Sequence, residues 1–322
     1  MKAIRVHQFG GPEVLKYEDA PDPVPKAGEA VIKVEAAGLN FIDTYQRSGA
    51  YKIPLPSILG QEGGGTVAAV APGVTDVKPG DRVAWTGILG SYAEKVAVPV
   101  ARLVALPPGV STKLGGAIML QGMTAHYLAC TTYPLKAGDT CLVHAGAGGV
   151  GLLLTQIARL RGARVITTVS NDEKAALSRG AGADHVILYT SQDFEEEVKK
   201  ITGGKGVQVV YDSVGQTTFA KSLNCLVPRG LLVLFGQSSG HVEPFDPHVL
   251  SAKGSLFLTR PTLVNYISSR EELVQRSSDL FGWIAAGTLQ IRTEFEFPLK
   301  DAAEAHRALE GRKTTGKVLL IP

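Results

Sequence analysis

The first third of the chain alternates short β-branched runs with Gly, Pro and Asp residues. Run length, spacing and the turn residues between runs are typical of strands. The runs lie at residues 3–6, 30–36, 66–70, 82–85 and 92–98. We therefore expect an all-β or barrel-like unit up to about residue 120.

From residue 141 onward, the pattern predicts strands that alternate with amphipathic helices. The apolar run 141–144 ends in glycines, and Val150, Leu153, Leu154, Ile157 and Leu160 then recur at helical spacing. The same unit repeats with further strands expected at 165–169, 186–189, 207–211, 231–235 and 255–259. Such alternation is typical of a parallel sheet covered by helices on both faces, so we expect a doubly wound α/β domain of about six strands.

The segment beyond residue 261 predicts helices at 271–286 and 300–310 and a terminal strand at 317–321. The six-stranded sheet is already complete before this segment, so we expect the tail to pack back onto the first domain. The expected domains are 1–125 together with 264–322, and 126–263.

Composition narrows the function classes. A length of 322 residues, with 44% hydrophobic and 20% charged residues, suggests about two globular domains and excludes a disordered chain. A net charge of +3 is too small for a nucleic-acid footprint unless the charges cluster. The three cysteines form no C-x-x-C pair, and no signal-peptide or membrane-length apolar run is present. We expect a cytoplasmic protein with no membrane partner. Glycine, with 37 of the 322 residues, is more frequent than in an average protein.

A glycine motif points to cofactor chemistry. Residues 146–151 read Gly-Ala-Gly-Gly-Val-Gly, which fits G-x-G-x-x-G between an apolar strand and an amphipathic helix. Glycines let the backbone approach a pyrophosphate, and the helix N-terminus offers free amides and partial positive charge. The sequence therefore predicts dinucleotide binding.

The end of the next expected strand bears on the choice between NADH and NADPH. Ser170 stands at the strand end, where an Asp or Glu would bind the ribose of NAD, and Lys174 follows one helical turn later. A small hydroxyl leaves room for a 2′-phosphate and a lysine supplies charge, so NADPH is favoured. Two alternatives stay open. Ser170 or Asn171 would be only a helix N-cap, or Asp172 would act as the NAD-type acid if the strand ran two residues longer.

Further motifs identify a family resemblance. Residues 78–83 (KPGDRV) and 180–184 (GAGAD), with the two-part organisation, resemble the medium-chain dehydrogenase/reductase superfamily. Residues 40–49, 209–215 and 256–261 are similar to the zinc-free NADPH:quinone oxidoreductases related to zeta-crystallin. The resemblance implies a Rossmann NADPH-binding domain and a β-rich GroES-like catalytic domain. It also implies quinone reduction and a homodimer formed through the edge strand 255–259.

The chain departs from the zinc alcohol dehydrogenases of the same superfamily. Those enzymes bind catalytic zinc through a Cys and a His, where this chain has Asn40 and Gln61. Neither amide is a competent zinc ligand, and three cysteines cannot build a four-cysteine structural site. We therefore expect no metal. A quinone or enone accepts hydride without a Lewis acid, because its conjugated system delocalises the charge.

The resemblance also assigns residues on the nicotinamide and substrate side. It implies catalytic roles for Asn40, Tyr45 and Thr124, with Asn40 and Tyr45 able to hydrogen-bond the cofactor or the acceptor oxygen. It places Gln121 in the connection between the domains. The cofactor contacts that it implies on this side are Phe41, Ile42, Asp43, Thr44, Tyr45 and Tyr127. The alternatives are that Asp43 and Tyr45 only anchor their loop and that Tyr127 only packs its helix.

The remaining implied cofactor contacts fall into three groups. Gly149 and Val150 would contact the pyrophosphate. Ser170, Lys174, Tyr189 and Arg312 would surround the 2′-phosphate and the adenine. The residues expected at strand ends are Val214, Gly236, Gln237, Ser238, Pro261, Thr262 and Leu263. No histidine or cysteine forms a nucleophile–base arrangement, so we expect structural roles for all of them.

Two other functions compete with quinone reduction. An NADPH-dependent alkenal or enone reductase would use the same fold, cofactor and zinc-free cleft. A non-catalytic NADPH-binding crystallin or RNA-binding protein is the alternative from another class. The small net charge and the absence of a basic-aromatic stripe argue against nucleic acid as the main partner.

Replacement of Lys174 with alanine tests the cofactor assignment. We expect Lys174→Ala to raise the Michaelis constant for NADPH much more than that for NADH, because only NADPH carries the 2′-phosphate. Steady-state kinetics with both cofactors measure the difference. Equal effects on the two would refute the assignment.

Overall fold

The computed structural model describes residues 1–322, which divide into two compact units. The first unit is Met1–Met123 together with Ile267–Pro322, and the second is Thr124–Tyr266. The division falls inside one long helix, α2 (Thr112–Tyr127). None of the helices has the length and apolar character needed to cross a membrane.

The first unit is built on two antiparallel-rich sheets. A small sheet has the order β2-β1-β4, and a larger one runs β15-β16-β3-β5-β6-β8 with β7 also paired to β3. Its strands are β1 (Lys2–Val6), β2 (Lys16–Asp19), β3 (Glu29–Leu39), β4 (Ser57–Ile58), β5 (Glu62–Val70), β6 (Arg82–Thr86), β7 (Lys95–Pro99), β8 (Val104–Ala105), β15 (Phe295–Pro298) and β16 (Val318–Ile321). Alternating residues of these strands, including Ile32, Val34 and Trp85, fill a buried apolar core.

Helices close the first unit around this core. They are α1 (Phe41–Ser48), most of α2, α9 (Arg270–Ala285) and α10 (Ala302–Glu310), with 3₁₀ turns at Pro12–Val14, Val100–Arg102 and Leu299–Asp301. The C-terminal strand β16 pairs antiparallel with β3, Val318 opposite Leu39. The expectation that the tail packs back onto the first domain is therefore confirmed.

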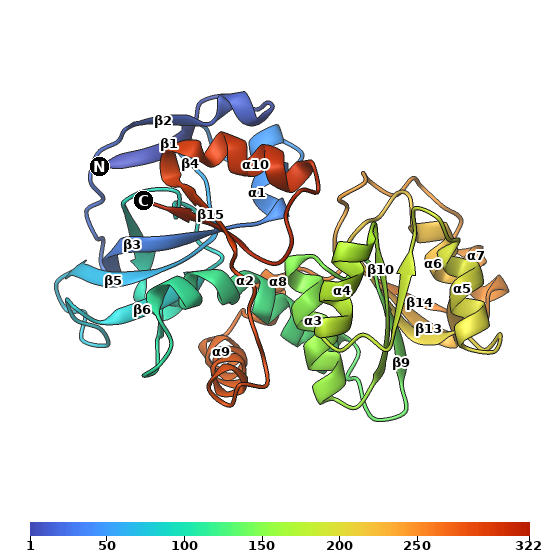
Figure 1. The fold of residues 1–322 in the computed structure, drawn as a ribbon. Coiled ribbons are helices and arrows are strands. Elements are labelled where there is room, and N and C mark those ends of the chain that lie inside the picture. Colours follow the sequence, from blue (N-terminus) through green and yellow to red (C-terminus); the bar gives the residue numbers. More distant parts are fainter. The chain divides into compact units, whose positions relative to one another are not determined.

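The second unit is a six-stranded parallel sheet in the order β11-β10-β9-β12-β13-β14. Its strands are β9 (Thr140–Val143), β10 (Arg164–Val169), β11 (His185–Leu188), β12 (Val207–Asp212), β13 (Leu226–Leu234) and β14 (Phe257–Thr259). Its helices are α3 (Gly149–Leu160), α4 (Asp172–Gly180), α5 (Phe194–Ile201), α6 (Phe219–Asn224), α7 (His248–Ala252) and α8 (Leu263–Tyr266), with a π turn at Leu128–Thr132. Helices α3 and α4 cover one face, and α5, α6 and α7 the other (Figure 1). This confirms the doubly wound prediction.

Two segments differ from the sequence-based expectation. From the sequence, Asp43 and Tyr45 are expected in a loop, but they lie in helix α1, with Asn40 as its N-cap and Gly49 at its end in left-handed backbone with φ 82°. Strand β13 begins at Leu226, five residues before the expected start at 231, because residues 226–230 continue the pairing with β12 through a bulge.

Glycines let backbone segments approach each other in the first unit. A Cβ on Gly64 of β5 would lie 1.9 Å from the carbonyl oxygen of Thr112, and one on Gly116 of α2 would lie 2.6 Å from that of Ala36. Helix α2 therefore rests directly on the backbone of β3 and β5, which no larger residue at these positions would allow.

Candidate functional site

The predicted pyrophosphate loop lies between β9 and α3. Gly148 is the N-cap of α3, and the helix begins with Gly149 and Val150. A Cβ on Gly151 would lie 2.3 Å from the carbonyl oxygen of Ala145, so the close turn requires glycine there. The loop backbone and the first amides of α3 therefore form the compact N-terminal cradle that a diphosphate needs.

Two further strand-end loops lie beside each other at the carboxyl edge of the same sheet. Asp212, the last residue of β12, accepts hydrogen bonds from the backbone amides of Val214 (2.8 Å) and Gly215 (3.0 Å). The loop after β13 is hydrogen-bonded to this turn, since Ser238 donates to the carbonyl of Ser213 at 3.1 Å. The predicted residues Val214, Gly236, Gln237 and Ser238 thus lie in two mutually bonded loops.

The predicted 2′-phosphate residues stand at the ends of β10 and β11. These strands are paired with Val169 opposite Leu188, so Ser170 and Tyr189 leave the sheet at the same edge. Asn171 is the N-cap of α4 and accepts a hydrogen bond from the Lys174 amide at 2.9 Å. Strand β10 ends at Val169 and Asp172 is the first helical residue, so the longer strand that would make Asp172 an NAD-type acid is wrong.

The connection after β14 holds Pro261, Thr262 and Leu263 at the start of α8. It is tied to the neighbouring loop by Arg260, which donates to the carbonyl of Leu234 (3.1 Å) and to Oε1 of Gln237 (3.3 Å). These strand-end segments therefore extend the same carboxyl edge.

Other predicted residues lie elsewhere in their units. Thr124 is buried on α2, and Tyr127 is buried with its ring stacked on Tyr266 at 4.1 Å between centroids. Gln121 lies one turn before Thr124 and is half-buried. Arg312 follows α10 in the first unit, exposed and with positive φ, 56°. Tyr127 therefore packs against Tyr266 in the second unit, and its contact with a cofactor stays a prediction.

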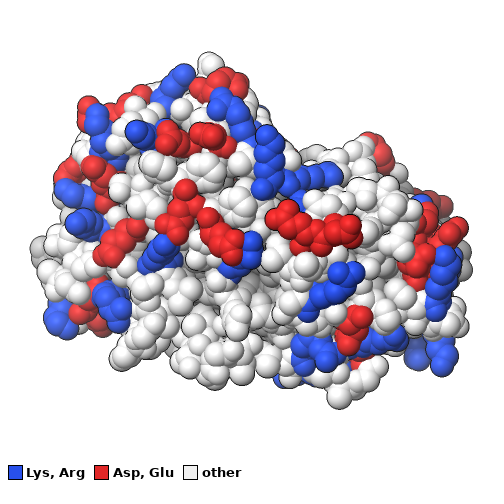
Figure 2. All heavy atoms as spheres, in the orientation of Figure 1, with Lys and Arg blue, Asp and Glu red and all other residues white.

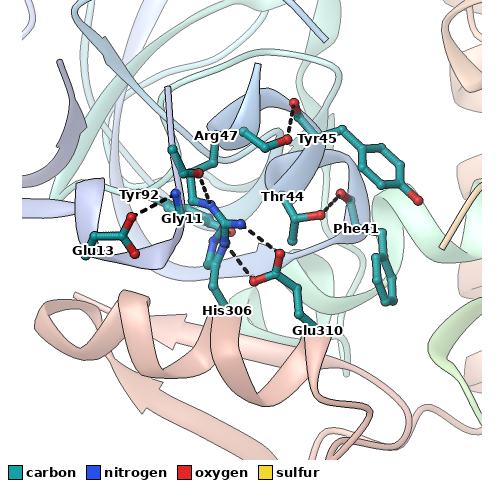
Figure 3. Close-up of polar contacts among 11 residues, drawn as sticks. Gly11, Glu13, Phe41, Thr44, Tyr45, Arg47, Tyr92, His306 and Glu310 are labelled. Carbon is teal, nitrogen blue, oxygen red and sulfur yellow. Dashed lines mark hydrogen bonds and ion pairs between the residues drawn. The ribbon is translucent and has the colours of Figure 1, made fainter. Parts of the chain in front are cut away.

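Helix α1 presents two aromatic rings on one face. Phe41 and Tyr45 are half-buried neighbours with ring centroids 6.4 Å apart, and Tyr45 also contacts Tyr51 edge-on at 5.4 Å. They lie on the opposite side of the helix from Arg47 (Figure 3). Asp43 and Thr44, by contrast, are buried, so their side chains support the helix.

Behind α1, a chain of hydrogen bonds runs from Arg47 to Asp43. Arg47 donates to Nδ1 of His306 (3.1 Å) and to both carboxylate oxygens of Glu310 (2.9 and 2.7 Å; Figure 3). A guanidinium only donates, so Nδ1 is an acceptor and the neutral ring carries its proton on Nε2. Nε2 lies 3.4 Å from the hydroxyl of Tyr92, which donates to Oδ2 of Asp43 at 2.9 Å. The same Oδ2 accepts a hydrogen bond from the backbone N–H of Asn40 at 2.8 Å.

Burial shifts the pKa values along this chain. Desolvation raises the pKa of Asp43 to about 6, against the hydrogen bonds from Asn40 and Tyr92. Desolvation lowers the pKa of His306 to about 3, and the charge of Arg47 acts in the same direction. The shift of His306 agrees with the hydrogen-bond directions, because Arg47 can donate only to a ring nitrogen that carries no proton.

A second buried group surrounds the side chain of Asn40. Lys317 pairs directly with Oε1 of Glu62, and the two side chains are 1% and 0% exposed. Asn40 donates to Oε1 of Glu62 at 2.8 Å and accepts from Nζ of Lys317 at 3.0 Å. Oε2 of Glu62 accepts the Leu120 amide of α2 at 2.6 Å. Loss of one partner would leave an unpaired buried charge, which costs about 3–5 kcal/mol.

The surroundings of Asn40 do not fit a divalent metal. Nζ of Lys317 already lies beside its oxygen. Burial lowers the pKa of this amine to about 7, and its protonated form would repel a second cation. No group of three or more His, Cys, Asp or Glu side chains in residues 1–322 has an arrangement that could hold a metal. The polar groups around Asn40 therefore suit the amine of Lys317 better than a metal ion.

Several residues that organise the site escaped the sequence analysis, namely Glu62, Lys317, Arg47, Tyr92 and Asp212. The signals for α1 were readable, because Asn40 with Asp43 three residues later, followed by Gly49, is a helix-capping pattern. Glu62 opens a glycine-rich strand, and Lys317 precedes an apolar one. A charged residue at the start of a buried strand is unusual, and this is the signal in the sequence that could have identified Glu62 and Lys317 as candidate site residues.

The structural expectation for the histidines and cysteines can be checked at particular residues. His144 is buried and lies 2.9 Å from Oγ1 of Thr168 and 3.0 Å from Oγ of Ser222. Cys141 and Cys225 are buried, and burial raises the pKa of both thiols. These residues pack the second unit, as expected.

Known proteins match the whole chain. Residues 26–108 match the family model of the alcohol dehydrogenase GroES-like domain, and residues 149–281 that of the zinc-binding dehydrogenases. A quinone oxidoreductase of Pseudomonas aeruginosa is 47% identical, with 100% of this chain and 99% of the relative covered. A 2-haloacrylate reductase of a Burkholderia species is 42% identical over 99% and 98%. The structure of Escherichia coli quinone oxidoreductase complexed with NADPH is 45% identical, with a TM-score of 0.98 and full coverage of both chains.

A glycine loop on a six-stranded parallel sheet, joined to a GroES-like unit, defines a medium-chain dehydrogenase/reductase. Within that superfamily, the chain belongs to the quinone oxidoreductase family.

The buried chain behind α1 predicts an unusual acid dependence of stability. His306 stays neutral in the folded state down to about pH 3, whereas in the unfolded state its pKa is 6.5. The free energy of unfolding is therefore unaffected by this group above pH 6.5 and decreases as the pH falls below that value, by about 5 kcal/mol at most. Asp43 has the opposite effect on the free energy of unfolding, because its pKa in the folded state is raised to about 6. The folded state is destabilised by this group above about pH 6, and the destabilisation decreases as the pH falls toward 3.8. Denaturant unfolding from pH 7 to 4 should therefore show a flatter profile for His306→Asn and a steeper one for Asp43→Asn. Parallel profiles for all three proteins would contradict these pKa shifts.

Proposed function

We propose that this protein reduces quinones with NADPH and without a metal. The observation that carries the proposal is the glycine loop at the N-terminus of α3, with Ser170 and Lys174 at the neighbouring strand end. Full-length similarity to quinone oxidoreductases, one of them solved with NADPH, supports it. When bound, the nicotinamide supplies a hydride.

We propose that the second unit is the NADPH-binding domain. Gly149 and Val150 would bind the pyrophosphate through backbone amides, and Ser170, Lys174 and Tyr189 would surround the 2′-phosphate and the adenine. The glycine cradle supports this, since side chains there would block the approach of a diphosphate. The remaining contacts of this unit would be Thr124, Tyr127, Val214, Gly236, Gln237, Ser238, Pro261, Thr262 and Leu263.

We propose that the first unit is the catalytic domain and that α1 serves the nicotinamide and the acceptor. Phe41 and Tyr45 offer an aromatic surface for a planar quinone, and Ile42 extends it. The Tyr45 hydroxyl would donate to the acceptor oxygen, and Asn40 and Thr124 would complete the catalytic set. Asp43 and Thr44 would act through the helix, and Arg312 would bind the 2′-phosphate.

An alkene reductase is the second candidate, because the 42% identical Burkholderia relative is a 2-haloacrylate reductase. A 2-haloacrylate and an enone share an electron-poor double bond that accepts hydride without a metal. A nucleic-acid-binding role has less support. On the face in Figure 2, basic and acidic residues are interspersed and neither sign forms a continuous patch.

An acceptor panel distinguishes these activities. The purified protein is mixed with NADPH or NADH and with quinones, alkenals, enones or 2-chloroacrylate, and the loss of reduced-nicotinamide absorbance is followed. We expect the highest kcat/KM with a quinone and NADPH. Oxidation only with 2-chloroacrylate or enones would favour the second candidate. Binding of NADPH without oxidation by any acceptor would favour a non-catalytic protein.

We propose that the protein is a homodimer formed through β14. This strand ends the six-stranded sheet, and its Phe257 is 60% exposed. An uncovered apolar edge strand favours pairing with a second copy.

Light scattering after size exclusion tests the dimer. Wild-type protein should have twice the mass of the 34.0 kDa chain, and Phe257→Lys should shift the population toward monomer. Val24→Lys is the matched control, because Val24 is also exposed but lies outside the sheets. A monomeric wild type, or an unchanged mass for Phe257→Lys, would contradict this interface.

A further inference from the structure

A chain of hydrogen bonds between buried side chains crosses the carboxyl edge of the parallel sheet in the second unit. Nδ1 of His144, the residue after β9, lies 2.9 Å from Oγ1 of Thr168 in β10. Nε2 of the same ring lies 3.0 Å from Oγ of Ser222 in α6. Ser222 in turn donates to Oδ2 of Asp212, the last residue of β12, at 3.1 Å. All four side chains are buried, and they connect the ends of three neighbouring strands.

The chemistry of these groups gives the chain one direction. A carboxylate only accepts, so the single hydrogen of the Ser222 hydroxyl must point to Asp212. If it pointed to His144, two oxygens would face each other in the interior without a hydrogen between them. Nε2 therefore carries the ring proton and donates to Ser222, and Nδ1 accepts from Thr168. Desolvation lowers the pKa of His144, against the charge of Asp212, which agrees with a neutral ring.

Asp212, at the end of this chain, anchors two loops. Its Oδ1 accepts the backbone amides of Val214 and Gly215 in the loop after β12. Its backbone carbonyl accepts the amide of Phe235 in the loop after β13 at 2.8 Å. The Oδ2 atom is left to Ser222 and to the hydroxyl of Thr218, which donates at 2.7 Å. The orientation of this carboxylate therefore determines where both loops lie.

The strand order places these two loops on one side of the glycine loop. Strand β9, which precedes the glycine loop, lies between β10 and β12. A dinucleotide with its pyrophosphate on that loop extends to both sides along the carboxyl edge. If Ser170 and Lys174 hold the adenine half beyond β10, the nicotinamide half lies over the loops after β12 and β13. Thr168 also reaches the glycine loop, since its carbonyl accepts the amide of Gly146 at 3.0 Å.

We propose that Asp212 positions the loops after β12 and β13 for the nicotinamide half of NADPH, and that His144 and Ser222 are positioning residues that orient its carboxylate. This inference rests on the proposed function, because it requires that NADPH binds to the second unit. None of the three side chains touches a ligand, since each residue is at most 1% exposed. Their effect on the cofactor passes through the backbone of the two loops.

Two ligands that differ only in the nicotinamide test the inference by binding alone. 2′-Phospho-ADP-ribose keeps the adenine, the 2′-phosphate and the pyrophosphate of NADPH but lacks the nicotinamide. Ser222→Ala removes one donor to Asp212. It should weaken NADPH binding about threefold to tenfold, the effect of one hydrogen bond, and leave the binding of 2′-phospho-ADP-ribose unchanged. Titration calorimetry measures each dissociation constant.

Ser178→Ala is the matched control. Ser178 is also a buried helical serine, and its hydroxyl lies 2.7 Å from Oγ1 of Thr167, but it belongs to α4 on the opposite face of the sheet. This variant should keep the wild-type ratio of the two dissociation constants. Equal weakening of both ligands by Ser222→Ala, or no weakening, would overturn the inference. A wild type that binds neither ligand would instead contradict the proposed function.

The position of the ring proton on His144 gives a second test, which packing alone would not affect. In Asp212→Asn, the amide oxygen can still accept the loop amides, but Nδ2 must donate to Ser222. Ser222 then donates to Nε2, so the ring proton moves to Nδ1. Nitrogen-15 NMR of histidine-labelled protein distinguishes the two tautomers, and His144→Gln identifies the signals. We expect Nε2–H in the wild type and Nδ1–H in Asp212→Asn. The same tautomer in both proteins would overturn the positioning role.

Discussion

A charge that is removed from water must find its opposite nearby, and in the first unit one such pair fixes much of the structure. Lys317 and Glu62 are enclosed by strands β3, β5 and β16 and by helix α2, and each compensates the other. Because either charge alone would be unstable in this interior, the segments that carry them must come together as the unit folds. The orientation of Asn40, and with it the start of α1, follows from this pairing.

Part of the glycine surplus has its physical reason in close backbone approaches, while many other glycines have positive φ. Gly38 leaves room for the carboxylate of Glu62, and Gly64 and Gly116 let α2 lie directly on the sheet. In the second unit, Gly151 allows the turn of the pyrophosphate loop. At each of these positions the absence of a Cβ lets a backbone segment or a side chain approach more closely than another residue would allow.

Local patterns predicted the second unit well and the first unit only in part. Apolar runs followed by helical spacing identified the six parallel strands, because each βα unit is continuous in sequence. The role of Asp172 depended on where β10 ends, and the end at Val169 places Asp172 in helix α4 instead of at the strand end. The buried group of Asn40, Glu62 and Lys317 could not be predicted from the sequence. Glu62 and Lys317 are separated by 255 positions in the chain, and no local rule relates a residue in β5 to one before β16.

The pair of Lys317 and Glu62 also constrains how such a sequence can evolve. A metal ion is acquired from the cell, and its ligands can be lost one at a time while the ion's affinity declines. An ammonium group is instead synthesised with the polypeptide, in a fixed ratio of one per chain and independent of metal supply. Substitution at either position alone strands a charge in the interior. A substitution at one of the two positions is therefore costly unless the other position changes as well.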